Sequence, residues 1–152
     1  MRAAEEPVKA TATPFSGKTT AQALVELQAI LENATVGILF SRNRKLVQAN
    51  SLCAEMFGYA LDEFIGLPGL DLYESAQQYE AVGRAASPVL SAGKPYQAEI
   101  QMRRRDGSLF WCRFSAKAVD PHTNHAGTIW IMEDVTEDRM MREALEQSTA
   151  EL

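Results

Sequence analysis

Two segments in the second half of the chain alternate between apolar and mostly polar residues, and this alternation constrains the fold more than any other feature. In residues 96–104 the apolar positions are Tyr96, Ala98, Ile100 and Met102. In residues 109–119 they are Phe110, Cys112, Phe114 and Ala116. A period of two places one face in a core and the other in solvent, as in an antiparallel β-sheet. The Asp–Gly pair of Arg105–Gly107 predicts a tight hairpin turn of the primed type between the two strands.

Shorter elements on either side of this hairpin predict an α+β fold. In chain order we expect a helix over residues 19–34, strands over 36–41 and 45–49, and a short helix that Asn50 or Ser51 caps and that ends near Gly58. A helical turn over 62–66 and a longer helix over 74–92, which Pro88 bends or breaks, come next. The two strands above, a fifth strand over 127–133 and a final helix complete the chain. Three consecutive strands after a helical region predict one five-stranded antiparallel sheet with short helices on one face, plus flanking N- and C-terminal helices.

The bulk composition excludes several classes of protein. With 152 residues, the chain has the size of one ordinary domain. Its net charge of -5 argues against nucleic-acid binding, which needs a basic surface. No apolar run approaches the roughly 18 residues of a membrane span, so we expect no membrane insertion by this fragment and a cytoplasmic location. Cys53 and Cys112 stand in apolar contexts and are interpreted as buried thiols.

We divide the chain into a linker or disordered segment (1–18), an N-terminal flanking helix (19–34), a core domain (35–136) and a truncated C-terminal signalling helix (137–152). Leu24, Leu27 and Leu31 form a narrow apolar seam on the first helix. This seam fits a helix that lies on its own domain or one that is shared with a second protomer. Met141, Leu145 and Leu152 form a weaker seam on the last helix.

Five short motifs, in order and at consistent spacings, resemble the PAS domain in its sensory-box form, which occurs in bacterial histidine kinases and cyclic-dinucleotide enzymes. They are Leu31–Ile38, Val47–Asn50 with Met56–Tyr59, Asp62–Gly66, Arg105–Gly107 with Trp111, and Asp134–Thr136. The resemblance implies a sheet curled over short helices, with a space between them that holds a small ligand or is filled by side chains. It also implies that the flanking helices carry the output.

The resemblance does not bring the family's usual cofactors with it. Residues 74–92, where haem-binding relatives carry an axial histidine, contain none. Gly69 stands near the position where photoactive flavin-binding relatives carry a reactive cysteine. His122, His125 and nearby Asp120 are interpreted as a solvated loop rather than a metal site. No catalytic motif is present, so we expect a regulatory domain without enzymatic activity.

The expected ligand pocket lies between the apolar face of the sheet and the helices. Its predicted residues are Ser41, Met56, Phe57, Tyr73, Tyr79, Val82, Ile100, Met102, Phe110, Cys112 and Phe114. Methionine and aromatic side chains suit a small apolar or aromatic molecule, although the same residues would also pack a filled core. The basic run Arg103–Arg105 is interpreted as solvated.

Two functions from different classes remain open at this point. One is a sensor that binds a small ligand or a partner state and relays it through the flanking helices to a covalently linked effector, such as a histidine kinase or a diguanylate cyclase. The other is a homodimerisation module with a self-filled core, dimerising through Leu24, Leu27 and Leu31. In either case Asp134, Thr136 and Glu137, which fit a helix capping box, are the predicted coupling residues.

Overall fold

The computed structural model describes residues 19–123 and 125–150, so the predicted linker over 1–18 and Leu152 lie outside the described residues. The chain forms two compact units, one up to Asn33 and one from Ala34 onward. The first unit contains helix α2 (Thr20–Glu32). Thr19 caps it, since its Oγ1 accepts a hydrogen bond from the Gln22 backbone at 3.1 Å and Gln22 Oε1 accepts one from the Thr19 backbone.

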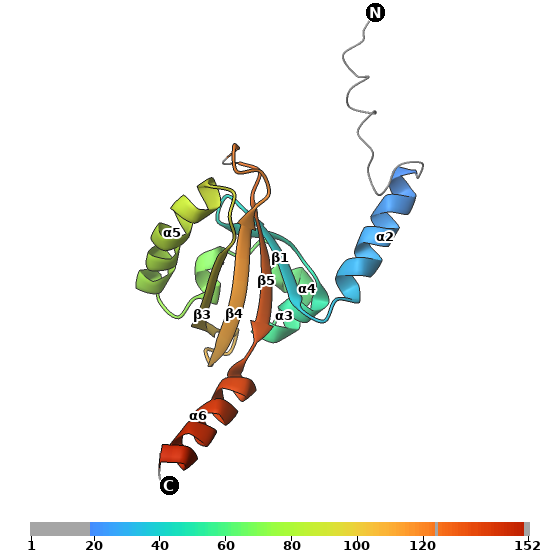
Figure 1. The fold of residues 1–152 in the computed structure, drawn as a ribbon. Helices are drawn as coiled ribbons and strands as arrows, with labels where there is room; N and C mark the ends of the chain where they lie inside the picture. The colour runs from blue at the N-terminus through green and yellow to red at the C-terminus, as the bar shows by residue number, and fades with distance from the viewer. Residues whose placement is uncertain (1–18, 124, 151–152) are drawn as a thin grey trace, which may run out of the picture. The chain divides into compact units, whose positions relative to one another are not determined.

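The second unit is built on one five-stranded antiparallel sheet with the strand order β2-β1-β5-β4-β3 (Figure 1). Its strands are β1 (Gly37–Arg42), β2 (Lys45–Ala49), β3 (Tyr96–Arg103), β4 (Leu109–Ala118) and β5 (Thr128–Asp134). β5 lies between β1 and β4, which joins the two hairpins into one sheet. The predicted α+β class and five-stranded sheet are confirmed.

The two hairpins use different turns, and the predicted primed turn was assigned to the wrong one. In the β1–β2 turn Asn43 and Arg44 both have positive φ, +55° and +64°, which is the pattern of a type I′ turn. In the β3–β4 loop only Gly107 has positive φ, +89°, and its N–H donates to Arg104 O at 2.9 Å. That loop is a type I turn followed by a left-handed glycine, because Asp106 keeps negative φ and accepts hydrogen bonds from Ser108.

The helical region between β2 and β3 contains α3 (Ser51–Phe57), α4 (Leu61–Phe64), the 3-10 helix η2 (Gly69–Leu72) and α5 (Ala76–Ser91). Buried Asn50 caps α3 and ties it to β1, since its Oδ1 accepts from the backbones of Cys53 and Ile38. α5 continues through Pro88, so the predicted bend or break does not interrupt the helix. Pro88 lies in the last part of α5, where it removes one N–H donor, the one that would bond the Arg84 carbonyl.

The core lies on one face of the sheet, where the helices cover it. Along β4 the buried residues are Phe110, Cys112, Phe114 and Ala116, as the alternation predicts. They belong to one apolar cluster with residues of α3, α4, η2 and α5. Helix α6 (Thr136–Ala150) leaves from the end of β5 (Figure 1). No helix in the described part of the chain is both long and apolar enough to cross a membrane.

Candidate functional site

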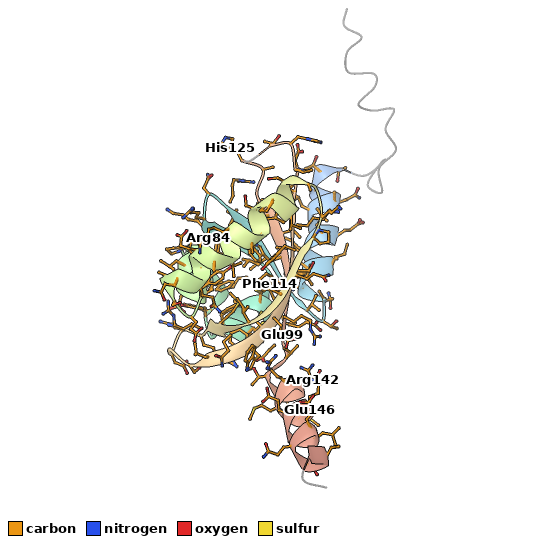
Figure 2. All side chains as sticks on the ribbon, turned by 60° about the vertical axis from the view of Figure 1, so that its left-hand side comes forward. Arg84, Glu99, Phe114, His125, Arg142 and Glu146 are labelled. Carbon is orange, nitrogen blue, oxygen red and sulfur yellow. The ribbon has the colours of Figure 1, made fainter. Side chains whose placement is uncertain are left out.

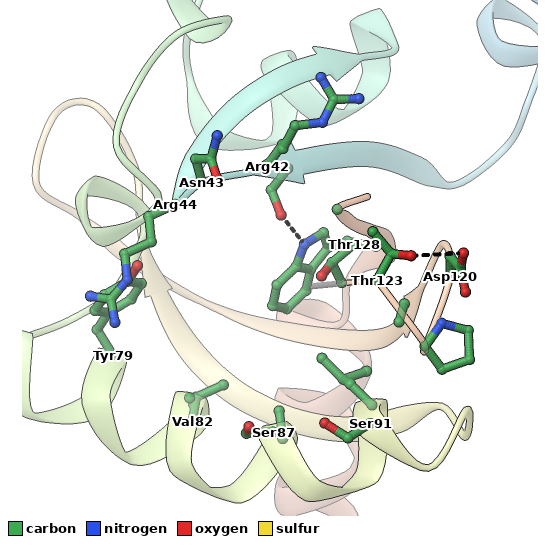
Figure 3. A pocket seen from close by; sticks show the side chains of 18 of the residues that line it. Arg42, Asn43, Arg44, Tyr79, Val82, Ser87, Ser91, Asp120, Thr123 and Thr128 are labelled. Atoms are coloured by element: carbon green, nitrogen blue, oxygen red, sulfur yellow. Dashed lines mark hydrogen bonds between the residues drawn. The ribbon is translucent and has the colours of Figure 1, made fainter. Parts of the chain in front are cut away.

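A cavity of about 450 Å³ opens between α5, the β1–β2 turn and the loop that joins β4 to β5 (Figure 3). We call it the outer cavity. Its apolar lining comes from Tyr73, Val82, Ala86, Leu90 and Trp130. Several lining residues of α5 are small, namely Gly83, Ala86, Ser87 and Ser91, and they leave room beside Val82 and Leu90.

Polar groups line the rest of the outer cavity. Trp130 Nε1 donates to Ser41 Oγ at 2.9 Å, which joins β5 to β1 inside the site (Figure 3). Ser87 and Ser91 add hydroxyls from α5. Asp120 shapes the loop at the rim, since its carboxylate accepts from Thr123 Oγ1 and from the His122 backbone.

A second, smaller space of about 60 Å³ lies deeper, among apolar residues of the sheet and η2. We call it the inner chamber. The two spaces share the lining residues Ser41, Arg44, Tyr73, Tyr79 and Trp130. Tyr73 and Tyr79 meet edge to face with ring centroids 5.0 Å apart, and the Arg44 guanidinium lies 5.8 Å from the Tyr79 centroid. Burial raises the pKa of Tyr73 well above its usual value, so this phenol stays protonated.

The structure brings together about half of the predicted pocket residues. Ser41, Tyr73, Tyr79 and Val82 line the outer cavity, and Met102 lines the inner chamber. The others lie outside the lining of both spaces and form packed core or its border: Met56, Phe57, Ile100, Phe110, Cys112 and Phe114. Phe57 packs against Phe110 and Phe64 with centroids 5.1 and 5.7 Å apart, which fills the space predicted for a ligand.

Sequence reasoning missed the arginines of the β1–β2 turn. Arg42, at the end of β1, and Arg44 both line the outer cavity while remaining solvent-exposed. The feature of the sequence that could have pointed to Arg44 is its position in the two-residue turn. A type I′ turn favours glycine at its second central position, and this chain has arginine there.

The output junction lies at the opposite end of the sheet, where β5 passes into α6. Asp134 Oδ1 accepts from the Thr136 backbone at 2.9 Å, and Asp134 Oδ2 pairs with Arg104 at 3.1 Å. Thr136 Oγ1 accepts from the Trp111 backbone, and Trp111 O accepts from the Val135 backbone, both at 2.9 Å. These bonds fasten the start of α6 to β4.

The predicted capping box does not form, because α6 begins at Thr136 and Asp134 still belongs to β5. Asp134 therefore bonds the N–H two residues ahead rather than that of Glu137. Among the described residues, Glu137 forms no hydrogen bond or ion pair with the junction. It is exposed on the first turn of α6, where its negative charge suits the helix dipole.

A cluster of charged side chains that the sequence did not reveal reinforces the output junction. The Arg139 guanidinium stacks 3.6 Å from the centroid of Trp111 and pairs with Glu99 at 2.6 Å. Arg113 and Arg142 also pair with Glu99, which lies with Arg142 at the base of the sheet (Figure 2). Desolvation alone would raise the pKa of Glu99, but hydrogen bonds from Arg139 and Arg113 outweigh it and lower the pKa.

The two cysteines, Gly69 and the two histidines occupy the positions that bear on cofactor binding and reactivity. Burial raises the pKa of Cys53 and of Cys112 to about 12, so both thiols are protonated and unreactive. Gly69 starts η2 and lies against Tyr79. His122 and His125 lie on the loop between β4 and β5. Within residues 19–123 and 125–150, no three histidine, cysteine, aspartate or glutamate residues group closely enough to hold a metal ion.

The arrangement of sheet and helices agrees with comparisons to known proteins. The sequence model described as the PAS domain matches residues 35–137. The chain belongs to the PAS domain family. This PAS domain superposes on that of a LuxR-family transcriptional regulator from Burkholderia thailandensis, solved in complex with ethanol, with a TM-score of 0.66 and 31% identity. The match covers 71% of this chain and 96% of that one.

Other matches lie within longer sensor proteins. The PAS domain is 26% identical over 125 residues to the sensor protein TdiS of Thauera aromatica, covering 82% of this chain and 23% of TdiS. It is 25% identical over 127 residues to the sensor histidine kinase TmoS of Ectopseudomonas mendocina, covering 82% of this chain and 13% of TmoS. The chain therefore spans less than a quarter of either relative. An RNA-binding light-oxygen-voltage receptor is 28% identical, with a TM-score of 0.68 over 92% of this chain and 41% of that receptor.

Proposed function

We propose that this PAS domain is a non-catalytic sensor that binds a small molecule with an apolar or aromatic body and relays its presence to an effector. The observation that carries the proposal is the outer cavity, which borders the inner chamber through shared residues and combines aromatic walls with a few polar groups. This combination is typical of small-molecule sites. A core built only for packing has no reason to leave such a space at one end.

The relay follows from the position of the two sites on one sheet. The outer cavity borders Ala118 and Thr128, which pair at one end of the β4–β5 ladder. The output junction begins at the other end of the same ladder, where Cys112 pairs with Asp134. A ligand that repacks the first end can therefore bias the way in which α6 leaves the second end. Asp134 and Thr136 are the residues through which this bias acts.

The effector is proposed to be a histidine kinase rather than a diguanylate cyclase. Similarity to a sensor histidine kinase and to a second sensor protein supports this choice. A PAS domain that signals to a cytoplasmic kinase would itself be cytoplasmic.

The test of the sensor proposal is native mass spectrometry of the full chain as purified from cells, followed by denaturing extraction. We expect a co-purifying small molecule at near-equal stoichiometry, or a stoichiometric complex after a small-molecule screen. The Ala86→Leu variant, which fills the outer cavity, is the matched control and should lose the molecule. A protein that carries nothing and binds nothing in the screen contradicts the proposal.

A second candidate function, homodimerisation, rests on α2. Taken by itself this helix buries none of its residues, and it exposes Leu24 (55%), Leu27 (41%) and Ile30 (60%). Val25 is exposed as well, so the apolar surface is broader than the predicted seam of Leu24, Leu27 and Leu31. Apolar helix surface of this kind is normally buried against another helix. We propose a parallel homodimer that this helix organises, in exchange with monomer.

Light scattering or sedimentation over a concentration series tests the dimer, on the wild type and on the double variant Leu27→Glu/Leu31→Glu. We expect the wild type to dimerise and the double variant to remain monomeric. Dimerisation of both proteins would indicate that the interface lies on the sheet face or on α6, where Met141 and Leu145 are exposed. A wild type that remains monomeric at high micromolar concentration contradicts the proposal.

A further inference from the structure

Arg44 is held in a backbone conformation that its side chain does not favour. Its φ of +64° lies in the left-handed region, where glycine is the preferred residue and any other L-residue costs about 1–2 kcal/mol. The turn is nevertheless well fixed, because Arg44 O accepts a hydrogen bond from the Gly69 backbone at 2.8 Å. An arginine at a position that favours glycine points to a role for its side chain beyond the turn.

The Arg44 guanidinium is available to a ligand. Most other arginines in the described part of the chain are bound to carboxylates: Arg104, Arg105, Arg113, Arg139 and Arg142. Arg44 forms no ion pair among the described residues and instead lies beside the Tyr79 ring, on the boundary between the outer cavity and the inner chamber (Figure 3). Arg42 lines the same cavity, but its guanidinium lies 5.0 Å from the Phe40 ring and points away from α5 (Figure 3).

The remaining charges around the outer cavity limit how negative a ligand can be. Glu80 and Asp120 also line it, so the two arginines are balanced by two carboxylates. A ligand with several negative charges, such as a phosphate ester, would be repelled by these carboxylates. One negative charge directed at Arg44 fits, because a carboxylate matches the planar donors of a guanidinium.

Resting on the proposed sensor function, we infer that the ligand is an aromatic monocarboxylate whose carboxylate pairs with Arg44. Its ring lies between the apolar side chains of α5 and the aromatic walls, Tyr73 and Trp130. The hydroxyls of Ser87 and Ser91 provide further hydrogen-bond donors along α5. The neutral apolar molecule expected from the sequence would make no use of the Arg44 charge, which would stay solvated beside the Tyr79 ring.

Isothermal titration calorimetry of the full chain with benzoate, benzamide and toluene tests the inference. Benzamide keeps the shape of benzoate without its charge, and toluene keeps only the ring. We expect benzoate to bind at least about tenfold more tightly than benzamide, and Arg44→Gln to abolish this preference. Arg84→Gln, which removes the same charge from α5 outside the cavity lining, should bind benzoate as the wild type does (Figure 2).

Arg44→Gly separates loss of binding from loss of folding. Glycine relieves the strain at φ +64°, so this variant should unfold at a higher denaturant midpoint and still lose the preference for benzoate. Equal or tighter binding of benzamide or toluene overturns the inference and leaves the sensor proposal standing. If none of the three compounds binds, the inference is also overturned, and the native mass spectrum then decides the sensor proposal independently.

Discussion

The two ends of the sheet's inner face are built from similar strands but are filled differently. At the end near the output junction, Phe57, Phe64 and Phe110 pack ring against ring, and none of them is more than 1% exposed. We call this the packed end. At the other end, Ser41, Ala86 and Ala118 face the outer cavity. We call this the open end.

The difference suits the proposed sensor function, in which one end of the sheet binds a ligand and the other transmits its presence. Small side chains at the open end leave room for a ligand, and close-packed rings at the packed end resist deformation. In that proposal, a change in packing at the open end would pass along β4 and β5 to the output junction. The packed end also carries the bonds that hold α6, so stiffness and output coincide there.

The largest expected effect compares truncations at the two ends. Phe57→Ala at the packed end should lower the free energy of unfolding by about 3–5 kcal/mol, because it opens a void that its neighbours cannot fill. Leu90→Ala at the open end should cost less than about 2 kcal/mol, since this side chain is half-buried and already borders empty space. Denaturant unfolding measures both. Similar losses at the two sites would show that the ends do not differ in packing.

The converse experiment enlarges a side chain at each end. Ala54→Leu at the packed end should cost about 1–3 kcal/mol, since the helix and strand around it leave no free volume. Ala86→Leu at the open end should stay within about 1 kcal/mol of the wild type, because the outer cavity accepts the added atoms. Equal destabilisation, measured by thermal or denaturant unfolding, would mean that the outer cavity collapses in solution.

The two hairpin turns give a third comparison, with effects of opposite sign. Gly107→Val at the packed end should lower stability by more than about 1 kcal/mol, because a β-branched residue tolerates positive φ badly. Space is not the cause, since a Cβ at Gly107 would meet no atom within 4 Å. Arg44→Gly at the open end should raise stability by about 0.5–1 kcal/mol. A denaturant midpoint for Gly107→Val within error of the wild type would contradict the assigned turn.

A small change in stability is also expected at the output junction. Asp134→Ala removes an acceptor for the Thr136 backbone and an exposed ion pair with Arg104, so it should cost only about 1 kcal/mol. In a full-length sensor that carries this domain, the same change should alter effector output or its response to ligand, because α6 loses a fixed exit angle. Asp138→Ala, an exposed change on the same helix, is the control. Unchanged output and an unchanged melting temperature for Asp134→Ala would show that Asp134 takes no part in the relay.

The sequence alone determined the order and type of the elements, except for the 3-10 helix η2. Each element depends on local chemistry, such as the alternation along β4, the Asn50 cap at the start of α3 and Gly58 at its end. These preferences act over a few residues, so they can be recognised in the sequence without knowledge of the tertiary contacts. The exact turn types were less legible, because an Asp–Gly pair serves more than one kind of hairpin turn.

Only the tertiary structure decided which inward-facing residues enclose a space. Met102 and Phe110 alternate in the same way and both face inward, yet one borders the inner chamber and the other is locked in the packed end. A cavity depends on the summed volumes of side chains from segments far apart in the chain, which no local pattern records. Arg44 escaped notice for the same reason, because its turn is polar in sequence and becomes a cavity wall only when η2 and α5 fold against it.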